Sequence, residues 1–168
     1  RAMTVDDIPF AARLYARDGA RSLVVCPRDE SFWRFLLTGY SPDSFEYRHY
    51  RIIETTDGRA MGYLSASPET WWNHFLGVVE IAFDEGAPVR AAMPAVLRAL
   101  KVIVDAQGAQ QKKDLGGIMF ACGREHPVYE AVPELFTRAR TPSGWFIRVP
   151  DVPIFIRHIA PVLESRLA

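Results

Sequence analysis

The feature that most constrains the fold is a change from strand-like to helix-like spacing between residues 78 and 104. The apolar run VVEIAF, residues 78–83, is typical of a buried strand. After a short loop, apolar residues recur at helical spacing, at positions 89, 93, 96, 97, 100, 103 and 104. A polar connection, Gly108–Asp114, then leads to a second apolar run, Gly117–Cys122. We therefore predict a helix over 89–104 that crosses between two strands of one sheet.

Upstream of this crossover, the sequence predicts two helices and a hairpin. The capping box TVDD at residues 4–7 opens a helix that runs to about Ala20, and Arg28–Thr38 carries its large apolar residues on one side. Tyr47–Thr55 and Arg59–Ser67 read as strands joined across Asp57-Gly58, a dipeptide that favours tight hairpins. Trp72–Phe83 is then a third strand, long or bulged.

Downstream, we predict a helix over Pro127–Ala139, a strand over Gly144–Val149 and a last helix that Asp151 and Pro153 open. Pro161 predicts a kink in that helix. The order of elements is ααβββαβαβα. Because the later helices cross between strands, the sheet is expected to be mixed and the fold class α/β or α+β.

Composition limits the classes of function. A chain of 168 residues that is 49% hydrophobic is expected to form one globular domain. Its 20 basic and 20 acidic residues give no excess charge that would favour nucleic acid. The apolar runs are too short to span a membrane, and no signal peptide is visible. Two distant cysteines, Cys26 and Cys122, suggest a reduced, cytoplasmic protein.

Two stretches resemble the GNAT superfamily of acyl-CoA-dependent N-acetyltransferases: Arg1-Ala2 followed by TVDDIPFAARLYA, and the hairpin IIETTDGRAMGYLSA with its Gly62-Tyr63 pair. The resemblance covers residues 1–149. It implies a mixed, mostly antiparallel central sheet flanked by helices, with the first strand largely missing here. Residues 150–168 resemble the junction to a sterol-carrier-like domain in multidomain bacterial acetyltransferases. In such proteins a second GNAT unit is often degenerate, and we expect this chain to be such a unit of a longer polypeptide.

The resemblance also implies a pyrophosphate loop of the form Q/R-x-x-G-x-G/A at the start of the crossover helix. The matching residues are Arg90-Ala91-Ala92-Met93-Pro94-Ala95, in which Arg90 and Ala95 fit the pattern. We expect Met93 to stand where the phosphates need room, and Pro94 in the first helical turn removes an N–H donor. Asp84 and Glu85 add negative charge beside the loop. These features favour a helix that retains the loop's position without its ligand.

Two residues are candidates for catalysis by their positions in the family pattern. Glu80 lies in the third predicted strand, where some members place a general base, and the alternative is a solvent-facing strand acid. Tyr129 lies in the helix where a tyrosine often serves as general acid, and the alternative is a packed aromatic side chain. Backbone groups near Ile81 and Phe83 would hold the pantetheine arm of acetyl-CoA.

Other residue clusters carry less chemistry. Cys122, His126 and His74 are too few, at no recognised spacing, to predict a metal site. The aromatic cluster at residues 71–75 fits an acceptor pocket or subunit contact as well as it fits the edge of a small core.

Three hypotheses about function follow. The first is an acetyltransferase that uses acetyl-CoA and a small-molecule or peptide amine. The second is an inactive GNAT-like unit that stabilises, or shapes the pocket of, neighbouring domains of the same polypeptide. The third is an interaction domain that uses the apolar face of the last helix, and self-association into a homo-oligomer is kept open.

Overall fold

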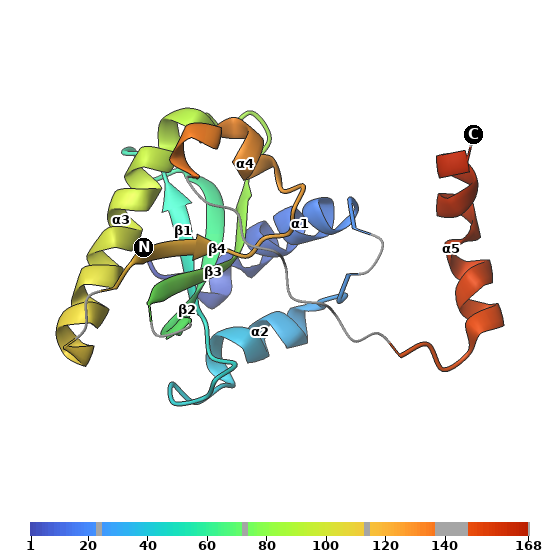
Figure 1. Cartoon of the computed structure of the whole chain (residues 1–168), viewed down its shortest axis with the longest axis horizontal. Coiled ribbons are helices and arrows are strands. Elements are labelled where there is room, and N and C mark those ends of the chain that lie inside the picture. Colours follow the sequence, from blue (N-terminus) through green and yellow to red (C-terminus); the bar gives the residue numbers. More distant parts are fainter. Residues whose placement is uncertain (23–24, 72–73, 113–114, 137–147, 168) are drawn as a thin grey trace.

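The computed structural model describes residues 1–22, 25–71, 74–112, 115–136 and 148–167 (Figure 1). Its centre is a four-stranded sheet in the order β1-β2-β3-β4. The strands are β1 (His49–Glu54), β2 (Ala60–Trp71), β3 (Phe75–Phe83) and β4 (Gly117–Phe120). The first three pair antiparallel and β4 joins β3 in parallel, so the predicted mixed, mostly antiparallel sheet is confirmed.

The first residues of the chain continue the sheet beyond β1. Ala2 forms an antiparallel bridge with Arg51, and the Met3 amide donates to the Tyr50 carbonyl at 3.0 Å. The chain then enters a 3-10 turn (Val5–Asp7), where the Asp7 carboxylate accepts from the amide and the hydroxyl of Thr4. The predicted capping box is therefore present, and Arg1-Ala2 occupies the position expected for the end of a first strand.

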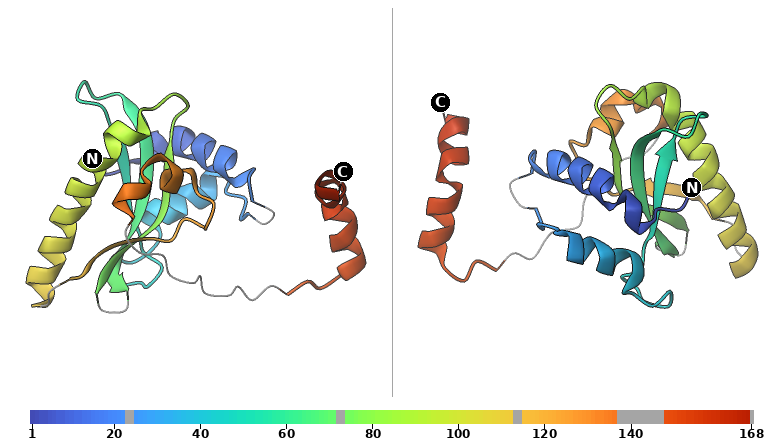
Figure 2. Two further views of the ribbon diagram at one scale, coloured as in Figure 1. Left: turned by 45° about the horizontal axis from the view of Figure 1, so that its top comes forward. Right: turned by 180° about the vertical axis from the view of Figure 1, so that it is seen from behind.

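Helices cover both faces of the sheet (Figures 1 and 2). On one face, α1 (Ile8–Gly19) and α2 (Glu30–Thr38) pack on β1 and β2 through a core centred on Trp33 and Leu14. On the other face lies α3 (Val89–Gln111), whose buried side chains at 93, 96, 100 and 104 follow the predicted helical stripe. The crossover helix is thus confirmed. The sheet separates two hydrophobic cores, one on the α3 side and one on the side of α1 and α2.

A β-bulge sets which residues of β3 face which core. Ser65 of β2 pairs with Glu80 and Ala66 pairs with Val78, so Val79 is an extra residue in β3. Before the bulge, the residues on the α3 side are Leu76 and Val78, whereas after it they are Ile81 and Phe83. Without the extra residue, Glu80 would lie on the α3 side with Leu76 and Val78. The bulge therefore turns Glu80 toward α1 and α2.

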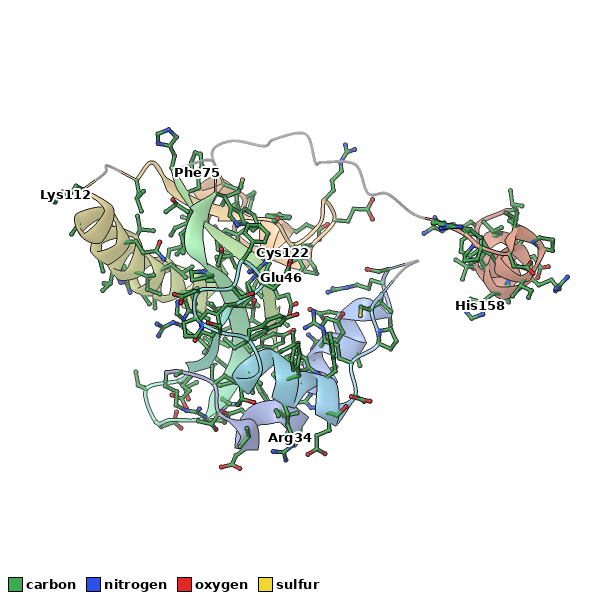
Figure 3. The ribbon with its side chains drawn as sticks, turned by 90° about the horizontal axis from the view of Figure 1, so that it is seen from below. Arg34, Glu46, Phe75, Lys112, Cys122 and His158 are labelled. Atoms are coloured by element: carbon green, nitrogen blue, oxygen red, sulfur yellow. The ribbon has the colours of Figure 1, made fainter. Side chains whose placement is uncertain are left out.

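Several predicted boundaries are wrong. The helix predicted to stop before Gly108 continues through it to Gln111, because one glycine costs only about 1 kcal/mol in a helix already anchored in the core. Lys112, in the left-handed region at φ 52°, ends it (Figure 3). The helix predicted over Pro127–Ala139 is the short α4 (Pro127–Ala131), since Pro133 starts a separate 3-10 turn (Pro133–Leu135).

The second and third strands also meet elsewhere than predicted. β2 extends to Trp71, beyond its predicted end at Ser67. β3 begins at Phe75 rather than at the predicted Trp72. A turn between them, in which the His74 amide donates to the Trp71 carbonyl, accounts for the difference. The predicted strand Gly144–Val149 lies largely outside the described residues, which resume at 148.

The last helix, α5 (Val152–Leu167), begins where Asp151 and Pro153 predicted, with the Asp151 carboxylate accepting from the Ile154 amide at 2.8 Å. The helix is continuous through Pro161. None of its described residues is buried, and it is drawn apart from the sheet in both views of Figure 2.

Candidate functional site

The site implied by the loop of α3 lies where β3 and β4 separate. Pairing of the two strands ends at Val78 and Phe120, after which the Ala121 amide makes one more bond to the Val78 carbonyl at 2.8 Å. β3 runs on to Phe83 without β4 beside it. A hollow of about 260 Å³ follows, lined by this end of β3, the start of α3, α4, Arg17 of α1 and Arg21, which follows the end of α1.

Arg90, the arginine of the predicted loop, is engaged elsewhere. Its guanidinium donates to the Ala131 carbonyl at 3.0 Å and pairs with Glu134 at 2.7 Å. Both partners lie at the end of α4 and the turn that follows it, so Arg90 links α3 to that segment. It is not among the residues that line the hollow, and neither is Ala95, which is exposed in the second turn of α3.

The expectation that Met93 obstructs a phosphate site is wrong. Met93 is fully buried between α3 and the sheet, on the side of the helix away from solvent. The stated position of Pro94 is also wrong, because α3 begins at Val89 and Pro94 therefore lies in its second turn. Both errors have one cause: the register of the helix is set by the apolar stripe, which takes Met93 into the core.

Ile81 and Phe83, the predicted pantetheine contacts, both have buried side chains. The Phe83 carbonyl already accepts from the Arg17 guanidinium at 2.6 Å. The Cys122 thiol lies 3.9 Å from the Val78 carbonyl of β3, and His126 lines the hollow together with Ala82 and Phe83. The edge that would pair with a coenzyme arm is therefore partly covered by the protein's own groups.

Glu80 is not the solvent-facing acid that we considered as an alternative. Its carboxylate oxygens accept from both terminal nitrogens of Arg28, at 2.5 and 3.1 Å, and Oε2 also accepts from the Tyr63 hydroxyl at 3.1 Å. The side chains of Glu80 and Arg28 are only 19% and 13% exposed. Such a paired arrangement is among the strongest that a carboxylate makes in proteins.

Aromatic rings enclose this ion pair. The Arg28 guanidinium carbon lies 4.0 Å from the centre of the Tyr15 ring and 5.0 Å from that of Trp33. Tyr50 and Tyr63 contact Trp33 edge to face. Burial, and secondarily the charge of Glu80, raises the pKa of Tyr50 to about 12 and raises the pKa of Tyr63 further. Both phenols therefore stay protonated at neutral pH and can only donate or accept hydrogen bonds.

Tyr129 is a packed aromatic residue whose hydroxyl is already bonded. It donates to the Phe120 carbonyl at 3.1 Å and accepts from the Cys122 amide at 3.4 Å. Its ring packs edge-on against Phe136, with centres 4.9 Å apart. Burial raises the pKa of Tyr129. Tyr129 joins the core on the α3 side whereas Glu80 faces α1 and α2, so the two catalytic candidates do not converge.

Two further clusters remain, the Cys/His group and the aromatic cluster 71–75, of which residues 72 and 73 lie outside the described residues. Burial raises the pKa of Cys122 to about 12, which disfavours the thiolate that a metal needs. Among the described residues, no three His, Cys, Asp or Glu side chains could hold a metal ion. Gly77 lies beneath the Trp71 ring, where an added Cβ would come within 2.5 Å, so this aromatic side chain covers its own sheet. No helix in the described part of the chain has the length and apolarity needed to cross a membrane.

Arg28 is the residue that sequence reasoning missed. It lies in the connection between α1 and α2, 52 positions from Glu80, and no local pattern joins the two. The one usable signal was an acid within an apolar strand, because a buried carboxylate requires a partner.

Comparison with known proteins places the fold. No family model matches the sequence, and no curated protein matches it. Among solved structures, a probable acetyltransferase superposes with a TM-score of 0.56 at 11% identity, over 90% of this chain and 97% of that one. The ribosomal-protein-alanine N-acetyltransferase from Brucella melitensis biovar Abortus 2308 gives 0.52 at 17% identity, over 89% and 97%.

These likenesses confirm the predicted fold class, a mixed α/β fold with a central sheet flanked by helices. More particularly, the chain shares its overall fold with these acetyltransferase structures.

Proposed function

We propose that the protein is an acyl-CoA-dependent N-acetyltransferase or a segment of one, and that this chain is a GNAT-like unit within it that does not itself transfer acetyl groups. Its role would be to support, or to shape the acceptor pocket of, an active unit in the same polypeptide. The α5 segment, 150–168, would join it to a further, sterol-carrier-like domain.

The ion pair between Glu80 and Arg28 carries this proposal. A general base must have a free lone pair within reach of the proton that it removes. Three hydrogen bonds already end on the Glu80 carboxylate, two of them from a guanidinium that stays protonated at any physiological pH. Of the roughly four lone-pair sites of a carboxylate, three are therefore already committed to the protein's own groups.

The other predicted groups support the same conclusion. The Tyr129 hydroxyl donates its hydrogen bond to the Phe120 carbonyl, whereas a general acid must point its O–H group at the leaving thiolate. Arg90 is paired with Glu134, and a phosphate would have to displace that carboxylate. Each of the three groups that the family pattern would use has a partner within the protein.

One observation favours an active enzyme as the second candidate. The hollow at the start of α3 places Arg17 and Arg21, both paired with Asp18 in its lining, beside a helix N-terminus, where an anion is stabilised by the helix dipole. In this candidate these two arginines, rather than Arg90, would hold the phosphates of acetyl-CoA. The acceptor would be a small-molecule or peptide amine.

Titration of acetyl-CoA against thermal stability separates the two candidates. A ligand at a hundred times its dissociation constant adds about 2.7 kcal/mol, which raises the midpoint of a chain of this size by about 5–10 °C. We expect no shift at millimolar acetyl-CoA. A shift that Arg21→Glu abolishes and Arg90→Glu leaves intact would refute the proposal and establish the second candidate. Arg90→Glu is the matched control, because both arginines are exposed and both have carboxylate partners.

A further inference from the structure

The surroundings of Glu80 form a site for a cation. Five side chains make it up, and we call them the Glu80 cage: Tyr15, Trp33, Tyr50, Tyr63 and Glu80. Two ring faces, those of Tyr15 and Trp33, lie over the Arg28 guanidinium beside the Glu80 carboxylate, and such a combination attracts a planar cation with N–H donors. The walls come from α1, α2, β1, β2 and β3, which are the regular elements of this face of the sheet.

The cation that fills the cage comes from a loop. Arg28 lies one residue before Asp29, the N-cap of α2, within the connection from α1. Its side chain reaches inward, and its two terminal nitrogens contact both oxygens of Glu80. The cage is thus built by the framework, whereas its occupant is carried by a connecting segment that does not belong to it.

The fit of Arg28 is incomplete. Among the described residues, its Nε is buried without a hydrogen-bond partner, although an arginine normally satisfies most of its five N–H donors. The Trp33 indole nitrogen is likewise buried without a partner within the part of the chain that the structure describes. The tether therefore leaves the Arg28 Nε donor unsatisfied, whereas a free guanidinium could turn that N–H group elsewhere. The Trp33 N–H is also a donor and would still need an acceptor, which a guanidinium lacks.

We propose that the Glu80 cage is a guanidinium-binding site, that Arg28 occupies it as an internal ligand, and that an external guanidinium group binds there when Arg28 leaves. The ligand must carry positive charge, because removing Arg28 alone would leave a buried carboxylate without compensation. It must also be planar to engage both oxygens of Glu80, which favours a guanidinium over an ammonium group. This inference goes beyond the proposed function and is independent of acetyl-CoA binding.

The first experiment empties the cage. Arg28→Ala removes the internal ligand, and Arg28→Ala combined with Glu80→Gln removes the anion as well. Arg34→Ala is the matched control, since Arg34 pairs with Glu30 on the outer side of α2 (Figure 3). Thermal stability is followed with methylguanidinium at millimolar concentrations, far below those that unfold proteins. Acetamide at equal concentration is the uncharged control and methylammonium the non-planar one.

We expect methylguanidinium to stabilise Arg28→Ala and to bind it at least about tenfold more tightly than it binds wild type, Arg34→Ala or the double variant. Methylammonium should bind more weakly and acetamide not at all. N-acetylarginine amide distinguishes the source of the group: tighter binding than methylguanidinium indicates the side chain of a peptide, and weaker binding indicates a small guanidine.

Two results would overturn the proposal. One is a folded Arg28→Ala, by circular dichroism, that binds methylguanidinium no better than wild type does. The other applies if Arg28→Ala does not fold alone: its refolding yield should then rise with methylguanidinium over acetamide, and an equal yield refutes the cage. Neither result depends on acetyl-CoA, so this proposal and the proposed function can fail separately.

Discussion

Replacing Met93 by glycine, the residue that the pyrophosphate-loop pattern has at this position, should destabilise the protein and gain no coenzyme binding. The pattern of the pyrophosphate loop alone suggests the opposite, because glycine at this position of the loop would give the phosphates room. In the structure, the Met93 side chain is fully buried against the sheet, so its removal empties core space. The variant Met93→Gly therefore tests whether the helix register or the loop pattern determines the role of this residue.

The magnitude follows from two terms. Truncating a buried methionine to alanine costs about 2–5 kcal/mol, and glycine in place of alanine inside a helix costs about 1 kcal/mol more. The total is a large part of the roughly 5–15 kcal/mol that stabilises a typical domain. Ala95→Gly is the matched control, since Ala95 is exposed in the same turn region of α3 and should lose only the helical term.

Urea unfolding followed by far-ultraviolet circular dichroism measures both variants. If Met93→Gly is unfolded in buffer, the milder variant Met93→Ala, with an expected loss of about 2–5 kcal/mol, is measured in its place. Acetyl-CoA should leave the melting temperature of each unchanged. If Met93→Gly lost no more stability than Ala95→Gly, or if it gained coenzyme binding, the assignment of Met93 to the core would be wrong.

Three further predictions concern the sheet, the imidazole beside β3 and the ion pair. Gly62→Ala should cost at least about 1–3 kcal/mol of stability, because its Cβ would lie 2.5 Å from the Ala82 carbonyl oxygen. Gly116→Ala is the control: its nearest neighbour would be at 3.6 Å, so its stability should change by no more than about 0.5 kcal/mol. Equal losses of stability in urea unfolding would contradict the packing argument. Burial lowers the pKa of His126 from its ordinary 6.5, although Asp18 opposes the shift, so the unfolded state binds more protons and stability should fall as the pH drops below about 6.5. His126→Gln should flatten that slope in unfolding measured from neutral to acid pH, and an unchanged slope would assign the effect to other groups. Glu80→Gln should cost up to about 3–5 kcal/mol of stability by leaving the Arg28 charge uncompensated. Glu30→Gln is the control: the Glu30 side chain is 69% exposed, so the loss should be about 0–1 kcal/mol. Similar melting temperatures for the two variants would show that the buried pair adds little.

The sequence was sufficient where local patterns coincide with packing. Asp57-Gly58 predicted the hairpin and the stripe from Val89 to Val104 predicted the crossover helix, because turn chemistry and helical periodicity act over a few residues. Helix ends were less predictable. Gly108 did not stop α3, since the buried turns before it already held the helix, and Pro133 stopped α4 although apolar residues continue beyond it.

The candidate site depended on contacts that sequence spacing does not encode. Glu80 was predicted as a candidate base, yet its partner Arg28 comes from the connection between α1 and α2, and only the fold brings their side chains within 2.5 Å. Arg90 matched the loop pattern, but its partners at Ala131 and Glu134 belong to a segment whose end was predicted wrongly. Position in a family pattern located these residues, whereas their bonding required the tertiary structure.

The extra residue Val79 also determines which changes of sequence β3 can accept. In the half before it, Leu76 and Val78 are buried on the α3 side and must stay apolar to cover the sheet. The half after it has its own alternation, so a polar side chain can be gained or lost at Glu80 without altering the side chains that Leu76 and Val78 send to α3. Loss of that single residue would exchange the two faces of the second half at once. A substitution at Glu80 therefore acts on the α1 side of the sheet alone, whereas a one-residue change in strand length acts on both faces of the second half.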